Sequence, residues 1–521
     1  MSALSQLIQI SVPAEHIHDS EFIRQRISSV CKGPFVDYRI QRRSIDARKR
    51  CPEYILQVKV YPDAPPPEED DTPPKRAWPT VAPDEPVIIV GAGPAGYFAA
   101  LKLISMGVCP VVLERGKDVR SRRIDIGRLH RKSIVDPDSN YCFGEGGAGT
   151  YSDGKLYTRS TKRGDVQSVL RLFVEHGASP DILIDVHPHI GSNVLPRLVE
   201  QLRNTILAHG GQVLFQSRVS DLIVSQNRAV GVRTEDGREF TGRAVILATG
   251  HSARDVYRML HRQAIRIEAK PFALGVRIEH PQSLIDQIFY HHSPRHQNLP
   301  AASYRMVCQV EGRGVYSFCM CPGGFIVPAS TAPGELVLNG MSMSRQDARY
   351  ANAGMVVEIR PADWSSFESS GPLAALEFQR QVEVAAFEAG KDKTQRAPAQ
   401  RVTDFVAGRI SASLPDTSYT PGVISAPVHD LLPESVSSRL REALTVFGKK
   451  HKGYFTGEAM VLAVESRTSS PVRIPRDPVT WMHPQVQQLY PCGEGAGYAG
   501  GIVSSAIDGQ LTAQAIVQQL R

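Results

Sequence analysis

The chain has 521 residues, 42% of them hydrophobic and 22% charged, which is ordinary for a soluble globular protein with room for about two to four domains. We expect neither a transmembrane helix nor a secretory signal, because the apolar runs are short and the N-terminus lacks a basic start. The protein is therefore expected to be cytoplasmic with eight free thiols, and its net charge of +7 permits acidic ligands such as nucleotides or RNA without requiring them.

Residues 1–61 are predicted to form a small α+β domain. Leu7–Val12 and Tyr54–Tyr61 have strand patterns, and Glu21–Val30 has the apolar spacing of a helix. Residues 62–86 contain nine prolines in 25 residues, a density that disfavours helix and sheet and favours an extended linker. The linker is the clearest domain boundary in the chain.

From Val87 onward the pattern changes to that of a nucleotide-binding α/β fold. Val87–Val90 and Val111–Leu113 are apolar strands on either side of a glycine-rich turn and a helix. Farther along, two helices are expected, at about Leu373–Ala389 and Ser435–Val446. We therefore predict two parts of one nucleotide-binding domain, 87–269 and 455–521, around an inserted α+β substrate domain, 270–454.

The first motif is the turn between those two strands. Gly91, Gly93 and Gly96 form a G-x-G-x-x-G sequence directly after a strand and before a helix. In such a turn the first glycine permits the tight bend, the second lets the backbone approach a pyrophosphate, and the third lets the helix pack against the strand. The N-terminus of the following helix, at Pro94 and Ala95, offers N–H groups to the phosphates.

Glu114 ends the second strand, 23 residues after Gly91, where a carboxylate accepts hydrogen bonds from ribose hydroxyls. A carboxylate there would repel the 2′-phosphate of NADP. The sequence Leu113-Glu114-Arg115-Gly116 looks like the flavoprotein form of the motif, which favours FAD, with NAD as the alternative.

Further segments resemble the two-domain FAD oxidoreductase superfamily in its order along the chain. They are Ser217-Arg218-Val219, the strand that ends in Ala248-Thr249-Gly250, and Leu489–Gly495, where Glu494 replaces the usual aspartate. The loop Phe143–Lys155 resembles one that runs beside the flavin, and an exposed surface loop is the alternative. The resemblance implies these FAD-binding residues: Gly91, Gly93, Pro94, Ala95, Gly96, Glu114, Arg115, Gly146, Gly147, Val219, Thr249, Gly250, Gly493, Glu494, Ala499, Gly500, Gly501 and Ile502.

Several segments together are similar to an uncharacterised bacterial family of FAD-dependent dehydrogenases. They include Arg42–Lys49, Gly144–Lys155, Phe318–Gly324, Glu465–Arg473 and Gly493–Gly501, so the resemblance spans nearly the whole chain. It implies a Rossmann-like FAD/NAD(P)-binding fold of the glutathione-reductase type with an inserted α+β domain, and a redox activity. It supplies no substrate.

Candidates for the chemistry are two thiols and two arginines. Cys319 and Cys321 could exchange electrons with a reduced flavin. On an extended strand residues i and i+2 lie roughly 6.5–7 Å apart, at or beyond comfortable disulfide reach, but a turn around Pro322-Gly323 could bring them closer. Buried or substrate-lining thiols are the alternative. Arg467 and Arg473 could hold an anionic substrate or the cofactor, or pair with Glu465 or Asp477. No metal site is predicted.

Three functions remain open from the sequence, of which the third is a flavin-bearing structural or regulatory protein without turnover. The first is an FAD oxidoreductase that moves hydride through flavin N5 to or from a small organic substrate, with NAD(P)H as a transient electron donor because no second G-x-G-x-x-G motif of this kind is present. The second is an RNA-modifying or RNA-binding flavoprotein. It would use the basic cluster between Arg39 and Arg50, for which a solvated face or an interdomain contact is the alternative.

Overall fold

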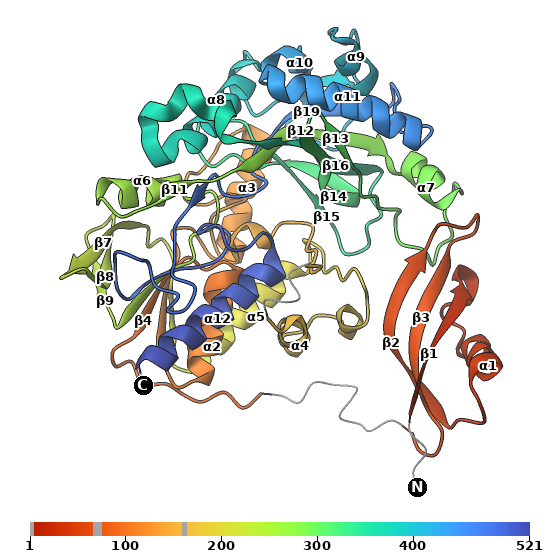
Figure 1. Cartoon of the computed structure of the whole chain (residues 1–521), viewed down its shortest axis with the longest axis horizontal. Coiled ribbons are helices and arrows are strands. Elements are labelled where there is room, and N and C mark those ends of the chain that lie inside the picture. The colour runs from red at the N-terminus through yellow and green to blue at the C-terminus, as the bar shows by residue number, and fades with distance from the viewer. Residues whose placement is uncertain (1–4, 66–75, 159–163, 521) are drawn as a thin grey trace.

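The computed structural model describes residues 5–65, 76–158 and 164–520. The N-terminal unit is an antiparallel sheet of strand order β1-β3-β2, made of β1 (Gln6–Pro13), β2 (Asp37–Asp46) and β3 (Glu53–Tyr61), with α1 (Ser20–Val30) beside it (Figure 1). The two predicted strands and the predicted helix coincide with β1, β3 and α1. The sequence did not predict β2, whose charges mask its strand pattern.

A five-stranded parallel sheet forms the nucleotide-binding fold, and this confirms the predicted α/β class. Its strand order is β21-β10-β4-β5-β6, with bounds β4 (Val87–Val90), β5 (Pro110–Leu113), β6 (Gln212–Leu214), β10 (Ala244–Leu247) and β21 (Leu489–Pro491). All four side chains of β4 are buried, as expected for a parallel strand covered on both faces.

Alternate residues of β4 face two different layers. Val87 and Ile89 pack with one set of helices, and Ile88 and Val90 pack with α6 and a small three-stranded meander. The first layer consists of α2 (Pro94–Ser105), α4 (Val166–Glu175), α5 (Leu195–Ala208) and α12 (Ile502–Leu520). The second consists of α6 (Arg254–Arg262), β7 (Val219–Ser225), β8 (Arg228–Thr234) and β9 (Glu239–Thr241).

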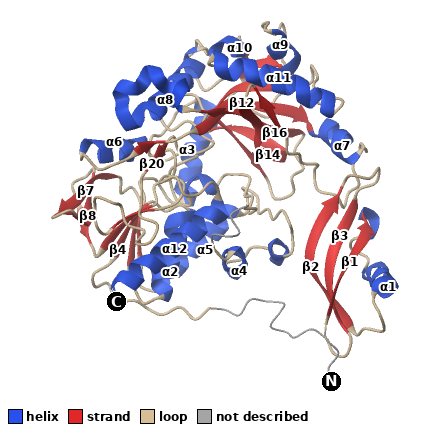
Figure 2. Cartoon of the chain, in the orientation of Figure 1, coloured by secondary structure: helices blue, strands red, loops and turns tan. Residues whose placement is uncertain are grey.

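A second, mostly antiparallel sheet of eight strands lies above the parallel sheet (Figure 2). Its main path is β13-β14-β16-β12-β19-β17-β18, and β15 pairs with β14. The bounds are β12 (Phe272–Pro281), β13 (Val307–Val310), β14 (Arg313–Pro328), β15 (Leu338–Ser342), β16 (Tyr350–Ile359), β17 (Ala397–Arg401), β18 (Val423–Ser425) and β19 (Met460–Glu465). Strand β19 lies beyond residue 454, where the sequence placed the end of the inserted domain.

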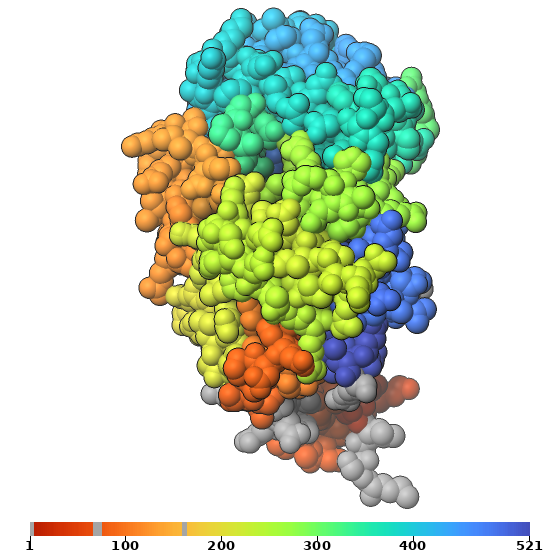
Figure 3. Space-filling model, turned by 90° about the vertical axis from the view of Figure 1, so that its left-hand side faces the viewer, coloured from red at the N-terminus to blue at the C-terminus, as the bar shows by residue number. Residues whose placement is uncertain are grey.

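Helices cover the outer face of the large sheet, and the inner face of this sheet is directed toward the parallel sheet (Figure 2). The covering helices are α8 (Ala374–Glu388), α9 (Val402–Ala407), α10 (Val428–Leu431) and α11 (Glu434–Lys450), and α7 (Gln282–Tyr290) lies at one end. The predicted helices coincide with α8 and α11. Seen from the side, the two layers form one continuous body (Figure 3).

Shorter elements connect these layers. The strands β11 (Glu268–Ala269) and β20 (Val472–Arg473) form a two-stranded ribbon, and α3 (Val119–Lys132) packs through Ile126 and Leu129 against the large sheet. The described parts of the predicted linker, 62–65 and 76–86, contain no helix or strand, and 66–75 lies outside the described residues. Among the helices that the structure describes, none has the length and apolar character to cross a membrane.

Candidate functional site

A cavity of about 370 Å³ lies between the carboxyl ends of the parallel strands and the inner face of the large sheet. Ligands of open α/β sheets bind at this edge. Fifteen of the eighteen predicted cofactor residues line it, the exceptions being Gly96, Gly146 and Ala499. Of the chemical candidates, Cys319 and Arg467 line the cavity, whereas Cys321 and Arg473 do not.

The glycine-rich turn at the start of α2 is packed so closely that glycine is required at two positions. Gly91 has a φ of +107°, and a Cβ there would fall 2.4 Å from the Ala248 carbonyl oxygen. A Cβ on Gly96 would fall 1.9 Å from the Gly91 carbonyl oxygen. Gly93 differs, because its nearest neighbour would be Gly147 Cα at 4.0 Å. The open space at Gly93 faces the cavity, beside the N-terminus of α2.

Glu114 has a structural task that the motif alone does not reveal. Its buried carboxylate accepts backbone N–H bonds of 2.9 Å from Ala92, Gly116 and Gly144. These bonds tie the end of β5 to two glycine-rich turns. A carboxylate offers about four lone pairs, so the side chain that lines the cavity retains capacity for one more donor.

Two buried side chains hold the loop Phe143–Lys155 in place. Arg122 donates to the carbonyl oxygens of Asn140, Tyr141, Glu145 and Gly147 at 2.7–2.9 Å. The Glu145 carboxylate accepts from Tyr97 Oη at 3.0 Å, the Val119 amide at 2.9 Å and Arg203 at 3.0 Å. No residue from 143 to 155 is exposed, so the alternative of a surface loop is wrong.

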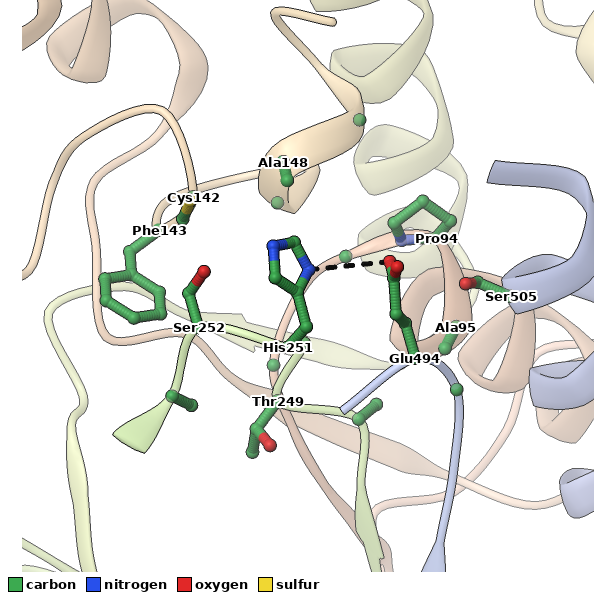
Figure 4. A pocket seen from close by; sticks show the side chains of 18 of the residues that line it. Pro94, Ala95, Cys142, Phe143, Ala148, Thr249, His251, Ser252, Glu494 and Ser505 are labelled. Atoms are coloured by element: carbon green, nitrogen blue, oxygen red, sulfur yellow. Dashed lines mark ion pairs between the residues drawn. The ribbon is translucent and has the colours of Figure 1, made fainter. Parts of the chain in front are cut away.

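The second glycine-rich turn, after β21, is held by an ion pair that the sequence did not point out. The Asp508 carboxylate accepts from the Gly493 amide at 2.7 Å and pairs with Arg476 at 2.6 Å. An aspartate inside the apolar run of α12 was the available signal. The Glu494 side chain points into the cavity, 3.5 Å from His251 Nδ1 and close to Pro94 (Figure 4).

A polar cluster forms the other end of the cavity. Lys155 Nζ lies 3.1 Å from the Asp153 carboxylate and donates to the Met320 carbonyl. Asp153 also accepts from Ser342 Oγ and lies 3.6 Å from His189. Burial is the largest influence on the Lys155 pKa and lowers it, but the Asp153 carboxylate and the Cys321 and Cys319 thiols together raise that pKa above its usual value. Burial lowers the pKa of His189.

The Cys319 thiol lies at this polar end, on β14. A hydrogen bond from the Cys321 thiol lowers the Cys319 pKa to about 6; burial opposes the shift and the Lys155 and Arg277 cations add to it. Cys321 is fully buried and has a raised pKa. The sequence could not supply this cluster, because it joins segments more than 150 residues apart.

The two candidate arginines have different surroundings. Arg467 is buried and pairs with Glu383 at 2.9 Å and Glu335 at 3.4 Å, so the predicted partners Glu465 and Asp477 are wrong. Its neighbour Arg254 contacts the same two carboxylates, at 2.5 Å and 2.8 Å. Arg473 is exposed and lies over the Tyr498 ring at 4.9 Å.

Two hydroxyl groups along the cavity test whether a polar cofactor fits. Thr249 Oγ1 and Ser252 Oγ are buried, and within the described residues neither has a hydrogen-bond partner. Buried polar atoms are rarely left without partners, so these atoms indicate a polar ligand in the cavity. The open space at Gly93 and the helix N-terminus beside it suit the pyrophosphate of FAD. The residues present therefore fit this cofactor.

Three family models match the chain. They describe an FAD-dependent protein, C-terminal domain-like, over residues 271–468, an FAD dependent oxidoreductase over 194–340, and a domain of unknown function over 4–61. Two solved structures are similar in fold. Glycine oxidase from Bacillus cereus is 14% identical, and the match covers 84% of this chain and 96% of that protein with a TM-score of 0.30. CtdE in complex with FAD is 12% identical, and the match covers 84% of this chain and 85% of CtdE with a TM-score of 0.33. Scores this low give no detail of the site.

Proteins related in sequence identify the family of the chain. Protein FixC of Escherichia coli is 28% identical over 204 residues, which are 39% of this chain and 45% of FixC. An uncharacterized protein of Clostridium beijerinckii is 42% identical over 436 residues, which are 83% of this chain and 80% of that protein. With the matching family models, this likeness shows that the chain belongs to a family of FAD-dependent oxidoreductases that includes the Clostridium protein, and that its cofactor is FAD.

Proposed function

We propose that the protein is a dehydrogenase that moves hydride between FAD and a small organic substrate bound at the polar end of the cavity. The observation that carries the proposal is the continuity of one cavity, which has the Gly91–Gly96 turn at one end and Lys155 and Cys319 at the other. When bound, FAD supplies hydride chemistry at its N5 atom. The protein supplies binding, orientation and charge.

Each part of the cavity has a role in this proposal. Gly91, Gly93 and the N-terminus of α2 bind the pyrophosphate, and Glu114 binds the adenosine ribose. The N-terminus of α12, at Ile502, offers N–H groups that favour negative charge. Lys155, held by Asp153, places a cation beside the substrate.

The basic N-terminal cluster gives the RNA alternative no support. Arg43 pairs with Asp185 at 2.7 Å, Arg48 with Asp46 at 2.6 Å and Lys49 with Glu53 at 2.9 Å. These three basic side chains therefore have acidic partners inside the protein. The ion pair between Arg43 and Asp185 joins the N-terminal unit to the nucleotide-binding fold. It is an interdomain contact, which was one of the two alternatives to RNA binding.

Anaerobic reduction of the purified holoprotein with NADH and NADPH tests the proposal. We expect the visible flavin absorbance to bleach, with a slower rate when the transferred hydrogen is replaced by deuterium. Lys155→Met is expected to lower the rate by about ten-fold or more while FAD stays bound, because a charge-stabilising group is lost. The control Lys102→Met changes a lysine of α2 that does not line the cavity. Equal rates in the two variants would remove Lys155 from the proposal.

A further inference from the structure

Strand β14 is irregular where it carries Cys319 and Cys321. The pairing of β14 with β16 shifts register between Phe318 and Cys321 and again between Cys321 and Gly324. Cys319 has a φ of +43°, which is uncommon outside glycine. The two cysteines therefore do not lie on a regular extended strand. The Cys321 thiol donates to the Cys319 carbonyl oxygen at 3.3 Å.

Charged groups surround the pair of cysteines. Arg277 is fully buried, donates to the Cys319 carbonyl at 2.7 Å and contacts Cys321 Sγ at 3.4 Å. The Lys155 ammonium favours a negative charge on Cys319, and the Asp153 carboxylate opposes it. Glu465 pairs with Arg277 at 2.9 Å. Two cations thus favour a thiolate within this pair of thiols, and the thiolate is the form that acts as a nucleophile.

The two thiols also differ in access. Cys319 lines the cavity, whereas Cys321 is buried behind it. An accessible thiolate of low pKa with a second thiol beside it is the arrangement of an attacking and a resolving cysteine. We propose that Cys319 and Cys321 are a thiol–disulfide exchange pair whose substrate is a small organic disulfide, with Cys319 as the attacking thiolate.

The exchange balances with the groups named. Cys319 Sγ attacks one sulfur of the disulfide RS–SR, whose S–S bond breaks, and RS⁻ leaves. Cys321 then attacks Cys319 Sγ, the mixed disulfide breaks, and a second RS⁻ leaves. The proton of the Cys321 thiol and one proton from solvent convert both RS⁻ into RSH. The pair loses two electrons and RS–SR gains them.

This inference rests on the proposed function, because it names the substrate class for the same cavity. Its test does not depend on flavin reduction. The holoprotein is reduced with a thiol, desalted without oxygen and treated with glutathione disulfide, and each cysteine is then followed by peptide mass spectrometry. We expect a Cys319–Cys321 disulfide in the wild type, a glutathione adduct on Cys319 in Cys321→Ser, and no adduct on Cys321 in Cys319→Ser.

Cys142 provides the control, since it also lines the cavity and its Sγ lies 3.9 Å from the Ala329 carbonyl oxygen. Cys142→Ser should behave as the wild type. A measurement without any variant is the iodoacetamide labelling rate in the reduced wild type. With a pKa of about 6 for Cys319, we expect it to react about ten-fold faster at about pH 6 than an ordinary exposed thiol such as Cys51.

Each outcome decides between the proposals. The exchange proposal would be overturned if iodoacetamide labels Cys319 no faster than Cys51. It would also be overturned if the Cys321→Ser protein forms no glutathione adduct on Cys319. If the pair exchanges while NADH and NADPH leave the flavin oxidised, the exchange proposal stands and their role as hydride donors fails. If the flavin is reduced and Cys319 stays inert, hydride transfer stands and the exchange pair fails.

Discussion

Gly93 and Gly96 belong to one turn but are glycines for different reasons. A Cβ on Gly96 would collide with the Gly91 carbonyl oxygen at 1.9 Å, whereas one on Gly93 would meet nothing closer than 4.0 Å. The protein itself therefore requires Gly96. The space at Gly93 is what a closely approaching pyrophosphate requires.

This difference predicts a separation of stability from cofactor binding. Gly96→Ala should lower the melting temperature of the apoprotein, because the helix must move away from the strand. Gly93→Ala should leave that melting temperature nearly unchanged and weaken FAD binding by about ten-fold or more, since the methyl group occupies the position of the phosphates. Calorimetry of the apoprotein and fluorescence titration with FAD measure the two effects. A Gly93→Ala protein with unaltered FAD affinity would refute the phosphate assignment.

Some residues of the site could be predicted from the sequence because their spacing is local. The spacing from Gly91 to Glu114 is set by one β-α-β unit, and Glu114 lines the cavity as expected. Arg122 and Asp508 could not be predicted, since each acts by satisfying backbone groups that only the folded chain brings near. The sequence gives the type of such a residue but not its partners.

At the scale of elements, α8 connects to the nucleotide-binding fold through a buried network of four charges. Glu383 on α8 is fully buried and contacts Arg254 of α6 at 2.5 Å and Arg467 at 2.9 Å. Burial opposes its charge, but these arginines hold the Glu383 pKa at about 2. Glu383 is therefore ionised near neutral pH, whereas burial raises the pKa of Glu335.

Glu383→Gln should consequently destabilise the protein by about 3–5 kcal/mol, because it leaves two arginines buried with one carboxylate. Glu377→Gln on the same helix is the control. Glu377 pairs with Arg258 and Arg380 near the surface, where an ion pair contributes about 1 kcal/mol or less. Urea denaturation followed by circular dichroism compares the two, and equal midpoints would contradict the role of the network.

Strand β12 carries a histidine that links stability to pH. His280 is fully buried, donates from Nε2 to the Tyr454 carbonyl oxygen at 2.9 Å, and has its pKa lowered by burial to about 4. In the unfolded chain its pKa is about 6.5. Between these values the unfolded state binds more protons, so the free energy of unfolding falls as the pH drops from about 6.5 to about 4.

The contribution of His280 to this loss is about 3 kcal/mol, at 1.36 kcal/mol per pKa unit. His280→Gln keeps an N–H donor and removes the titrating ring, so its stability should fall less steeply on acidification. Urea denaturation of both proteins between about pH 7 and about pH 4.5 gives the difference, in which the other histidines cancel. Parallel curves for the two proteins would show that another group dominates.

The strand that carries Cys319 shows why sequence patterns predict that a strand forms but not how it pairs. The alternation of β14 indicates a strand, but the register shifts on either side of Cys321 follow from its pairing with β16, and Cys319 has a positive φ. Strand β19 is a similar case. It is adjacent in sequence to the C-terminal glycine-rich motifs, yet it pairs with β12 and β17 in the large sheet. Pairing partners of this kind are set by the whole fold.

In the whole molecule, the N-terminal unit contacts both layers of the rest of the chain. Its core is continuous with that of the large sheet, and Asn298 accepts from Tyr54 Oη at 2.5 Å through its carbonyl and donates to the Ala14 carbonyl at 3.0 Å. On the other side, the Arg43 amide donates to the Ile184 carbonyl at 2.8 Å, and the Val186 amide donates to the Arg43 carbonyl at 3.0 Å. Strand β2 thus pairs briefly with the nucleotide-binding fold.

The ion pair beside this bridge should govern how firmly the unit is held. Asp185 accepts two hydrogen bonds from Arg43, at 2.7 Å and 3.1 Å. Asp185→Asn removes the charge, and we expect hydrogen exchange at the Arg43 and Val186 amides to rise about five- to ten-fold, which corresponds to about 1 kcal/mol. Asp46→Asn is the control, because Asp46 pairs with its near neighbour Arg48 on the same unit. Since the bridge lies outside the cavity, the flavin spectrum should be the same in both variants. Exchange that stays unchanged in Asp185→Asn, or that rises equally in both, would show that the apolar contact with the large sheet holds the unit without help from the ion pair.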